Sequence, residues 1–500
     1  MTTSGGLLLV LAVLAPFVAV MAGLVLGGRN AERVALAAVG AGLVIAFEIA
    51  RAVLASGQPM VYLLGGWAPP LGVALRADGL SVVMMLAVGV VIAGVAVYAR
   101  ADFGTPTGMH ETRASLTFWS LLMAAWGALN LVFVSGDVFT LYVALELLTF
   151  AGVPLVCLDG RGETLRAALR YLVFALLGSM VYLLGVFLLY GAYGTLDIAM
   201  LGERVAASPL TWSAAALMTA GLLAKTALFP LHLWLPPAHA GAPAAASAVL
   251  SALVIKGSWF LVVRLWLDVF PGIVTWSAAQ WLAGLGVAAI VTGNLVALKQ
   301  VRLKLLIAYS TVAQIGYLFL MFPLAAGARA AHMDDTAAVT GGMLQAISHA
   351  TAKAAMFMAA GLIYTTLGHD RVAELRGAGR ALPMTMLAFA LAGASLIGLP
   401  PSGGFLAKWL LMSAAFSSAQ WWWALAMLIG GLLTSIYIFI VVMHAMAPAA
   451  VGWTPKRAVP GYQQGVVLAL ALCSFLLGAA ALLPPDLMRV GRPHTGWVAP

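Results

Sequence analysis

The sequence predicts an all-α protein that crosses a membrane many times, and three observations support this fold class. Hydrophobic residues make up 63% of the 500-residue chain and charged residues only 9%, whereas soluble domains carry roughly 25% charge. The mean hydropathy is +1.03. Apolar stretches of about 20 residues, the length that a helix needs to cross a bilayer, recur along the whole chain. The chain therefore belongs in lipid.

About fourteen transmembrane helices are expected from these stretches. They are 6–26, 33–55, 79–99, 115–134, 138–157, 165–191, 212–238, 243–267, 276–298, 303–325, 337–366, 383–418, 422–447 and 463–485. We expect them to form an N-terminal three-helix segment (1–110), a first repeat of spans 4–8 (111–270), a second repeat of spans 9–13 (271–450) and a C-terminal span 14 (451–500).

Proline interrupts two of the stretches, where the helix loses a backbone donor and should break. The interrupting residues are Pro230, Pro236 and Pro237 in the seventh stretch and Pro400, Pro401, Gly403 and Gly404 in the twelfth. These two stretches are five spans apart and cross in opposite directions. They are therefore expected to be the broken helices of two inverted five-helix repeats. The alternative is that the prolines only kink their helices.

Apart from four lysines, the basic residues are distributed unevenly between the two sides of the membrane. With the N-terminus away from the cytoplasm, the inner side carries Arg29, Arg33, Arg100, Arg113, Arg161, Arg166, Arg170, Lys299, Arg302, Lys304, Arg371, Arg376, Arg380, Lys456 and Arg457. The outer side carries only Arg51, Arg76, Arg204, Arg264, Arg329, Arg489 and Arg492. This asymmetry predicts a multi-pass protein of the bacterial inner membrane with both termini on the outer, periplasmic side. It explains the net charge of +9 without a nucleic-acid partner.

Four lysines lie inside predicted spans, where a charge costs roughly 2.5–3.5 kcal/mol and usually faces a bundle interior or a hydrated cavity. They are Lys225, Lys256, Lys353 and Lys408. Glu146 lies near the middle of the fifth span, at a depth similar to that of Lys225 and Lys256. A nearby carboxylate favours the protonated form of a lysine, whereas burial favours loss of its proton. A lysine under both influences can therefore take up and release protons. A static ion pair that only fixes helix packing is the alternative.

Histidines extend this set of ionisable residues. His349 and Lys353 are spaced i, i+4 and share a helix face. A neutral histidine carries one donor and one acceptor and can relay protons, although a membrane histidine can also simply pack. His232 and His239 flank the break in the seventh span. They are weaker candidates for the cytoplasmic mouth of a proton path, with a location at the membrane interface as the alternative.

No cofactor or metal is expected in this chain. Its two cysteines, Cys157 and Cys473, lie in apolar runs and do not support a disulfide framework, a thiolate zinc site or an iron–sulfur cluster. The sequence has no apparent P-loop, Rossmann glycine loop or flavin site. Driving energy must therefore come from partners, and we expect other membrane subunits of a multisubunit complex.

Three motif blocks resemble those of one family. They are KTALFPLHLWLPPAH (225–239), followed by Pro243, Ser247 and Lys256-Gly257; LKLLIAYSTVAQIGY (303–317); and GLPPSGGFLAK (398–408). The blocks closely resemble the antiporter-like subunits shared by respiratory complex I and Mrp-type cation/proton antiporters. The resemblance covers almost the whole chain and implies fourteen helices with two inverted half-channels.

The resemblance also implies a role for each ionisable residue. Glu146 and Lys225 would form the first ion pair. Lys256 and His349 would form the central hydrated relay, with Lys353 on the same axis. Lys408 would be the exit lysine.

Within the family, GGWAPPLG (65–72) and Asp78-Gly79-Leu80-Ser81 resemble the Mrp D-type subunit more than the subunits of complex I. Gln314 stands where the M-type subunit of complex I tends to have histidine, and Lys408 where it has glutamate. The sequence also lacks the long lateral helix of the L-type subunit.

Three functions are consistent with these residues. The first is a proton-translocating subunit of an Mrp-type Na⁺/proton antiporter. The second is the pump subunit of a redox enzyme of the complex I (NADH-quinone oxidoreductase) or membrane-bound hydrogenase type, not catalytic alone. The third is a membrane subunit of an inorganic-carbon accumulation complex. In all three, protons would move from Lys225 through Lys256 and His349 to Lys408.

Overall fold

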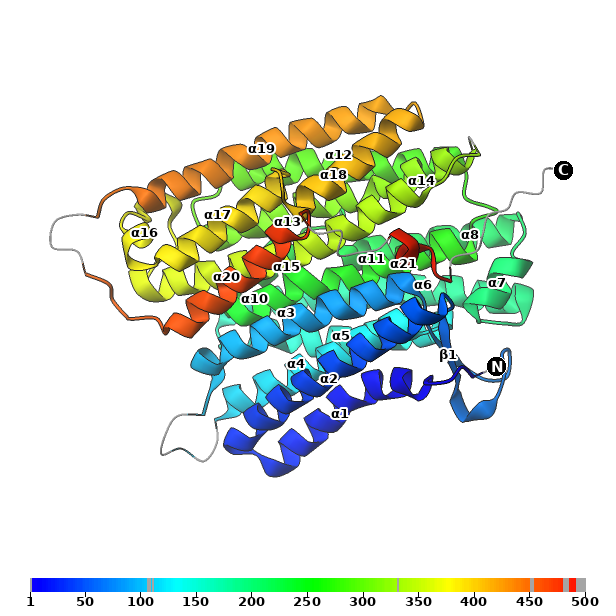
Figure 1. Cartoon of the computed structure of the whole chain (residues 1–500), viewed down its shortest axis with the longest axis horizontal. Helices are drawn as coiled ribbons and strands as arrows, with labels where there is room; N and C mark the ends of the chain where they lie inside the picture. Colours follow the sequence, from blue (N-terminus) through cyan, green and yellow to red (C-terminus); the bar gives the residue numbers. More distant parts are fainter. Residues whose placement is uncertain are drawn as a thin grey trace.

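The computed structural model describes residues 2–105, 109, 112–330, 332–449, 454–479 and 485–491. Helices lie side by side along the long axis of the molecule (Figure 1). Eleven of the described helices are long and apolar enough to span a membrane, which confirms the multi-spanning helical class. They are α1 (Leu7–Leu26), α2 (Gly28–Ser56), α3 (Gly79–Phe103), α4 (Arg113–Val134), α5 (Val138–Val156), α6 (Gly162–Tyr193), the run from α10 to η3 (Ala244–Val269), α12 (Trp276–Leu298), the run of α13 and α14 (Leu303–Ala330), α15 (Thr336–Leu367) and α19 (Trp421–Met446).

The three other predicted stretches contain shorter helices, so the number fourteen stays a prediction. The seventh holds α8 (Pro209–Thr226) and α9 (Leu235–Gly241), and the twelfth holds α17 (Pro383–Ile397) and α18 (Gly403–Ser417). Both expected breaks are therefore present. The last stretch holds α20 (Gly461–Leu476), and part of it lies outside the described residues. Short helices α7 (Ile198–Arg204), α16 (Ala378–Ala381) and α21 (Pro485–Arg489) lie between or after the long ones.

One element departs from the all-α prediction. Strands β1 (Met60–Leu63) and β2 (Ala74–Ala77) form an antiparallel pair in which Met60 faces Ala77 and Leu63 faces Ala74. The Thr3 amide donates to Val61 O at 2.9 Å, and Arg76 Nη2 donates to Gly491 O at 2.6 Å. Both ends of the described chain therefore lie beside this hairpin, at one end of the bundle (Figure 1).

The centre of the bundle is formed by α15 and by the run from α10 to η3. The apolar windows of both are completely buried, whereas those of α1 and α2 are 28% buried and that of α19 is 33% buried. The helix α15 packs against α3, α10, α13, α17, α18 and α20. Helices α1 and α2 lie at one edge of the bundle and α19 at the other (Figure 1). The outer helices therefore face lipid, and the central ones are shielded from it.

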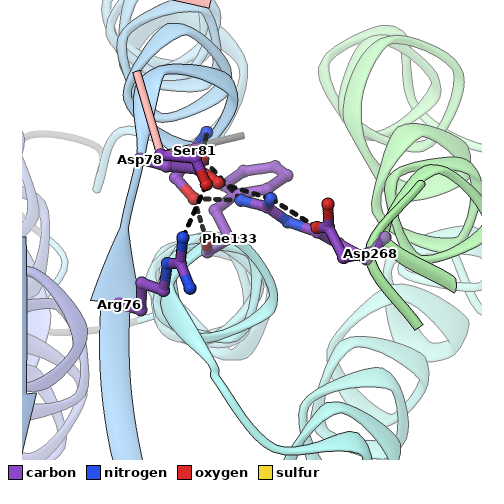
Figure 2. Close-up of polar contacts among 7 residues, drawn as sticks. Arg76, Asp78, Ser81, Phe133 and Asp268 are labelled. Atoms are coloured by element: carbon purple, nitrogen blue, oxygen red, sulfur yellow. Dashed lines mark hydrogen bonds and ion pairs between the residues drawn. The ribbon is translucent and has the colours of Figure 1, made fainter. Parts of the chain in front are cut away.

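A buried ion-pair cluster ties the start of α3 to α11 (Ile255–Arg264). Arg264 Nη1 lies 2.5 Å from Asp78 Oδ2, and Arg264 Nη2 donates to Asp78 Oδ1 at 2.6 Å. The same guanidinium lies 2.9 Å from Asp268 Oδ2 and donates to Ser81 Oγ at 2.8 Å. Ser81 donates in turn to the Phe133 carbonyl of α4 at 2.5 Å (Figure 2). The cluster thus joins three helices near the hairpin.

Arg264 falls within the predicted stretch 243–267, and the sequence gives no indication of its partners. Its side chain is only 9% exposed and lies within the helical run, because two carboxylates neutralise its charge there. Burial alone would raise the pKa of Asp78. The charge and hydrogen bonds of Arg264, with the Ser81 amide and the charge of Arg76, outweigh burial and lower the pKa of Asp78 to about 2.

We predict that Asp78→Asn lowers the melting temperature of the detergent-purified protein, because breaking a buried ion pair costs about 3 kcal/mol. The folded-state pKa of Asp78 lies below its ordinary value of 3.8. The stabilisation by the wild-type carboxylate is therefore complete above about pH 4 and is lost as the pH falls toward 2. Thermal unfolding across this pH range, detected as loss of soluble protein, measures both the destabilisation by Asp78→Asn and the pH dependence of the wild type.

Asp334→Asn is the matched control. Asp334 Oδ2 lies 2.5 Å from Arg489 Nη2, but both side chains are more than half exposed. Such a pair contributes about 0.5 kcal/mol. Equal melting temperatures for Asp78→Asn and Asp334→Asn would show that the buried cluster does not stabilise the fold.

Candidate functional site

The first group of ionisable residues lies where α5, α6 and α8 meet. Lys225 Nζ, near the end of α8, lies 3.0 Å from Glu146 Oε1 of α5. The Ser179 hydroxyl of α6 contacts both the Lys225 ammonium and the Glu146 carboxylate. Lys225 Nζ also lies 3.4 Å from Leu145 O. The predicted approach of Glu146 and Lys225 is therefore present, with a serine between them that sequence reasoning missed.

A small cavity adjoins this ion pair on the side of α11. Its volume is about 10 Å³, and its lining includes Lys225, Thr149, Tyr171 and Ser258. This is close to the space that one water occupies, and the lining offers polar partners for one. Thr226 Oγ1 donates to Ser258 Oγ at 3.0 Å. Hydroxyl groups therefore lead from Lys225 toward α11, which carries Lys256.

Lys256 lies at the centre of the bundle, just after a π-helical turn, η2 (Leu250–Val254). Its side chain is 1% exposed, and its ammonium donates to Ser251 O at 2.7 Å. A π turn changes the hydrogen-bond pairing of the helix locally, and such turns are frequent at functional sites. The irregular turn therefore supplies the oxygen atom that the buried ammonium needs.

His349 and Lys353 of α15 face the same central region. Lys353 Nζ donates to Ile307 O at 3.0 Å and contacts the Ser310 hydroxyl, both on α13. His349 is 1% exposed, and neither ring nitrogen has a hydrogen-bond partner among the described residues. Lys256, His349 and Lys353 are close enough to interact electrostatically. The structure therefore brings these three predicted residues together.

The two histidines at the first break differ from each other. His239 is fully buried, its ring nitrogens have no described partner, and its ring centroid lies 5.3 Å from that of Phe357. It also interacts electrostatically with Lys256. His239 therefore belongs to the central group and not to the interface. His232 is half-buried and stacks on Phe229 at 5.5 Å.

Lys304 lies at the start of a helix, as expected from the predicted stretch 303–325. It lies in the first turn of α13 and donates to Ala242 O at 2.7 Å, just after α9. The long side chain of Lys304 extends from the start of α13 to the end of α9. No pattern in the sequence indicates this contact, because it depends on how α9 and α13 pack.

Lys408 of α18 lies at the second break. Its ammonium donates to Leu396 O at 2.7 Å and to Ile397 O at 2.9 Å, which are carbonyls at the end of α17. Gln314 Nε2 also donates to Leu396 O, at 3.3 Å, and Gln345 Nε2 donates to Gln314 Oε1 at 3.0 Å. Gln345 lies one helical turn from His349. The amides therefore connect the central group to the Lys408 site.

The described residues include no group of three or more histidine, cysteine, aspartate or glutamate side chains placed to hold a metal ion. The site is instead a line of buried amines, hydroxyls and amides. Amines and hydroxyls can pass protons through hydrogen bonds, directly or through water, and the amides can bind the intervening water.

Glycines fix how closely the helices at the first ion pair approach. A Cβ atom on Gly221 of α8 would lie 2.3 Å from Gly178 O of α6, and one on Gly178 would lie 2.6 Å from Gly221 O. These helices therefore touch backbone to backbone, as small residues allow in membrane proteins. The contact brings Lys225 within reach of Ser179 and Glu146.

Comparison with known proteins places this arrangement in a family. A sequence profile described as "NADH:quinone oxidoreductase/Mrp antiporter, TM" matches residues 135–434. NADH-quinone oxidoreductase subunit N of Desulforudis audaxviator is 34% identical over 399 residues, which cover 78% of this chain and 76% of that protein. The D-type subunit of the Na(+)/H(+) antiporter of Bacillus subtilis is 27% identical, with 84% and 81% covered.

Solved structures have the same fold. A chain of the Mrp complex from Dietzia sp. superposes with a TM-score of 0.86 at 23% identity, covering 97% of this chain and 96% of the other. A chain of the membrane-bound sulfane sulfur reductase, an archaeal respiratory membrane complex, superposes with a TM-score of 0.86 at 26% identity, covering 96% of each chain.

We predict that Gly221→Ala destabilises the protein by about 1–3 kcal/mol, because the added methyl group forces α6 and α8 apart. Gly191→Ala, in α6, is the control, since nothing lies within 4 Å of its Cβ position. Thermal unfolding of the two purified variants makes the comparison. A melting temperature for Gly221→Ala at or above that of Gly191→Ala would contradict the close contact.

Proposed function

This chain belongs to the NADH:quinone oxidoreductase/Mrp antiporter family, and from that premise we propose that it translocates protons in an Mrp-type Na⁺/proton antiporter complex. The observation that carries the proposal is the line of buried lysines that runs from Glu146 and Lys225 to Lys408. Beyond the first pair, none of these lysines forms an ion pair with a described carboxylate. A static structural role would favour paired charges, whereas proton transfer needs groups that can be left neutral.

The proposed path has three parts. A proton is held between Lys225, Ser179 and Glu146, passes to Lys256 by way of Ser258 and water, and reaches His349 and Lys353. Water bound along the amides of Gln345 and Gln314 then carries the proton to Lys408. A proton on one lysine raises the energy of a proton on its neighbour through Coulomb repulsion, so protons advance stepwise.

The proposal includes a fold of fourteen spans with two inverted repeats, spans 4–8 and 9–13. The two breaks, after α8 and after α17, support it, because each has one of the buried lysines beside it. Both ends of the described chain lie beside the hairpin. This supports a location of both termini on the same side of the membrane. The distribution of basic residues favours the outer side.

The choice of the Mrp type depends on the sequence around residues 65–81 and on Gln314 and Lys408.

A redox-driven pump is the second candidate, and specific similarities favour it. The relative from Desulforudis audaxviator is a subunit of an NADH-quinone oxidoreductase, and F(420)H(2) dehydrogenase subunit N of Methanosarcina mazei is 28% identical to this chain. In either complex the chain needs partner subunits.

The two candidates predict different partners. The tagged chain, purified from its native membrane in mild detergent, is expected to bring small colourless membrane subunits that mass spectrometry identifies. A flavin, iron–sulfur or nickel absorption spectrum in the purified complex would overturn the Mrp type in favour of a redox-driven pump.

Lys225→Ala is expected to abolish proton translocation by the complex while the folded chain stays in the membrane, because the path loses its first amine. Dye-detected proton movement in native membrane vesicles measures this. Lys299→Ala is the control, because Lys299 is exposed at the end of α12. Full translocation by Lys225→Ala would contradict the proposed path for either type of complex.

A further inference from the structure

The ammonium of Lys408 is held without a carboxylate from the part of the chain that the structure describes. Its Nζ lies 4.3 Å from the centroid of the Tyr317 ring, in addition to its bonds to Leu396 O and Ile397 O. Lys408 is 5% exposed, so its charge is shielded from bulk solvent. Two carbonyl oxygens supply partial negative charge on one side. The face of an aromatic ring, which is also electron-rich, supplies it on another.

The Tyr317 ring is fixed in this position by neighbouring helices. The residue is fully buried in α13, and its hydroxyl donates to Met427 O of α19 at 3.3 Å. A Cβ atom on Gly430 of α19 would lie 2.3 Å from the Tyr317 hydroxyl. A glycine is therefore required where α19 closes over the ring. The ring has no room to turn away from the ammonium.

We infer that Tyr317 is the positioning residue of Lys408, and that its ring face takes the place that the Glu146 carboxylate has beside Lys225. This inference depends on the proposed function. In the proposed repeats, α5 and α13 are corresponding spans, and each supplies the side chain that faces the lysine near its break. The first half uses an anion and the second a neutral ring.

A neutral partner changes what happens when the lysine loses its proton. Proton loss from Lys225 leaves the Glu146 carboxylate, whose side chain is only 14% exposed, without a counter-ion, which is costly. Proton loss from Lys408 leaves only a ring and two carbonyls, none of which carries a net charge. Tyr317 thus holds the ammonium in place for transfer and imposes no charge penalty on its release.

Tyr317→Phe and Tyr317→Leu test this inference in the purified complex reconstituted into vesicles. Tyr317→Phe keeps the ring and is expected to retain at least half of the wild-type translocation rate. Tyr317→Leu removes the ring and is expected to lower the rate about tenfold. Tyr98→Leu is the matched control, because Tyr98 is also buried and its hydroxyl also donates to a methionine carbonyl, Met358 O, at 3.3 Å.

A second measurement separates the effect of the ring's electron density from the effect of its shape. Phenylalanines with increasing fluorine substitution at position 317 keep the ring but weaken its negative face. The inference predicts a stepwise fall in rate along this series at constant melting temperature. A flat series would overturn it and assign Tyr317 a packing role. This measurement tests the role of the Tyr317 ring even if Tyr317→Leu does not fold.

The remaining outcomes are also decisive. Loss of transport in Tyr317→Phe equal to that in Tyr317→Leu would overturn the inference, because the hydroxyl bond to Met427 O would then be the important contact. Wild-type rates in Tyr317→Leu with no transport in Lys225→Ala would overturn the role of Tyr317 alone. Wild-type rates in Lys225→Ala would overturn the proposed path itself.

Discussion

Each buried ammonium in this protein is bound by backbone carbonyl oxygens, and regular helices have few of these to offer. Within a helix, each carbonyl accepts the amide four residues further along the chain. Lys408 uses the last carbonyls of α17, which are free because the helix stops there. Lys256 uses Ser251 O in the π turn. Lys256 and Lys408 therefore use irregular backbone, which is tolerated in the bundle centre because protein shields it from lipid. Lys353 instead donates to Ile307 O within the regular helix α13.

The irregular segments near the bundle centre lie beside lysines, whereas the central helix α15 is continuous over 32 residues. The π turn η2 and the break between α17 and α18 each lie beside a lysine, and the break after α8 lies two residues beyond Lys225. Helices at the lipid-facing edge, such as α2 and α19, are continuous over more than 25 residues. Glycines complete the arrangement, because the close contacts of Gly178 with Gly221 and of Gly430 with Tyr317 bring charged or aromatic side chains within reach of their partners.

Much of this arrangement is visible in the sequence, because lysines and prolines in apolar stretches are conspicuous. The two breaks and the approach of Glu146 to Lys225 follow from such residues, and the grouping of Lys256 with His349 is implied by the resemblance of the motifs to one family. Serines and tyrosines in membrane helices are common, so nothing singles out Ser179, Ser310 or Tyr317. Their roles depend on which helices meet. The partners of Arg264 and Lys304 are not visible in the sequence for a related reason. Arg264 is neutralised by Asp78, nearly two hundred residues away along the chain. Lys304 reaches back to the end of α9. Pairing over such separations is a property of the packed bundle.

The distribution of negative charge along the proposed path determines how protons can move along it without partner subunits. Glu146 is the only carboxylate among the described residues that forms an ion pair with one of the four buried lysines. Any proton beyond Lys225 is therefore an uncompensated positive charge, and two of them at about 10 Å repel by roughly 2 kcal/mol at an effective dielectric constant near 20. Neighbouring lysines consequently avoid being charged together, and a proton can step either way through the centre. Direction must then be imposed at an end of the path, where a partner changes the energy of the Glu146–Lys225 pair or of the Lys408 site. This is the physical reason for such a chain to work within a larger complex.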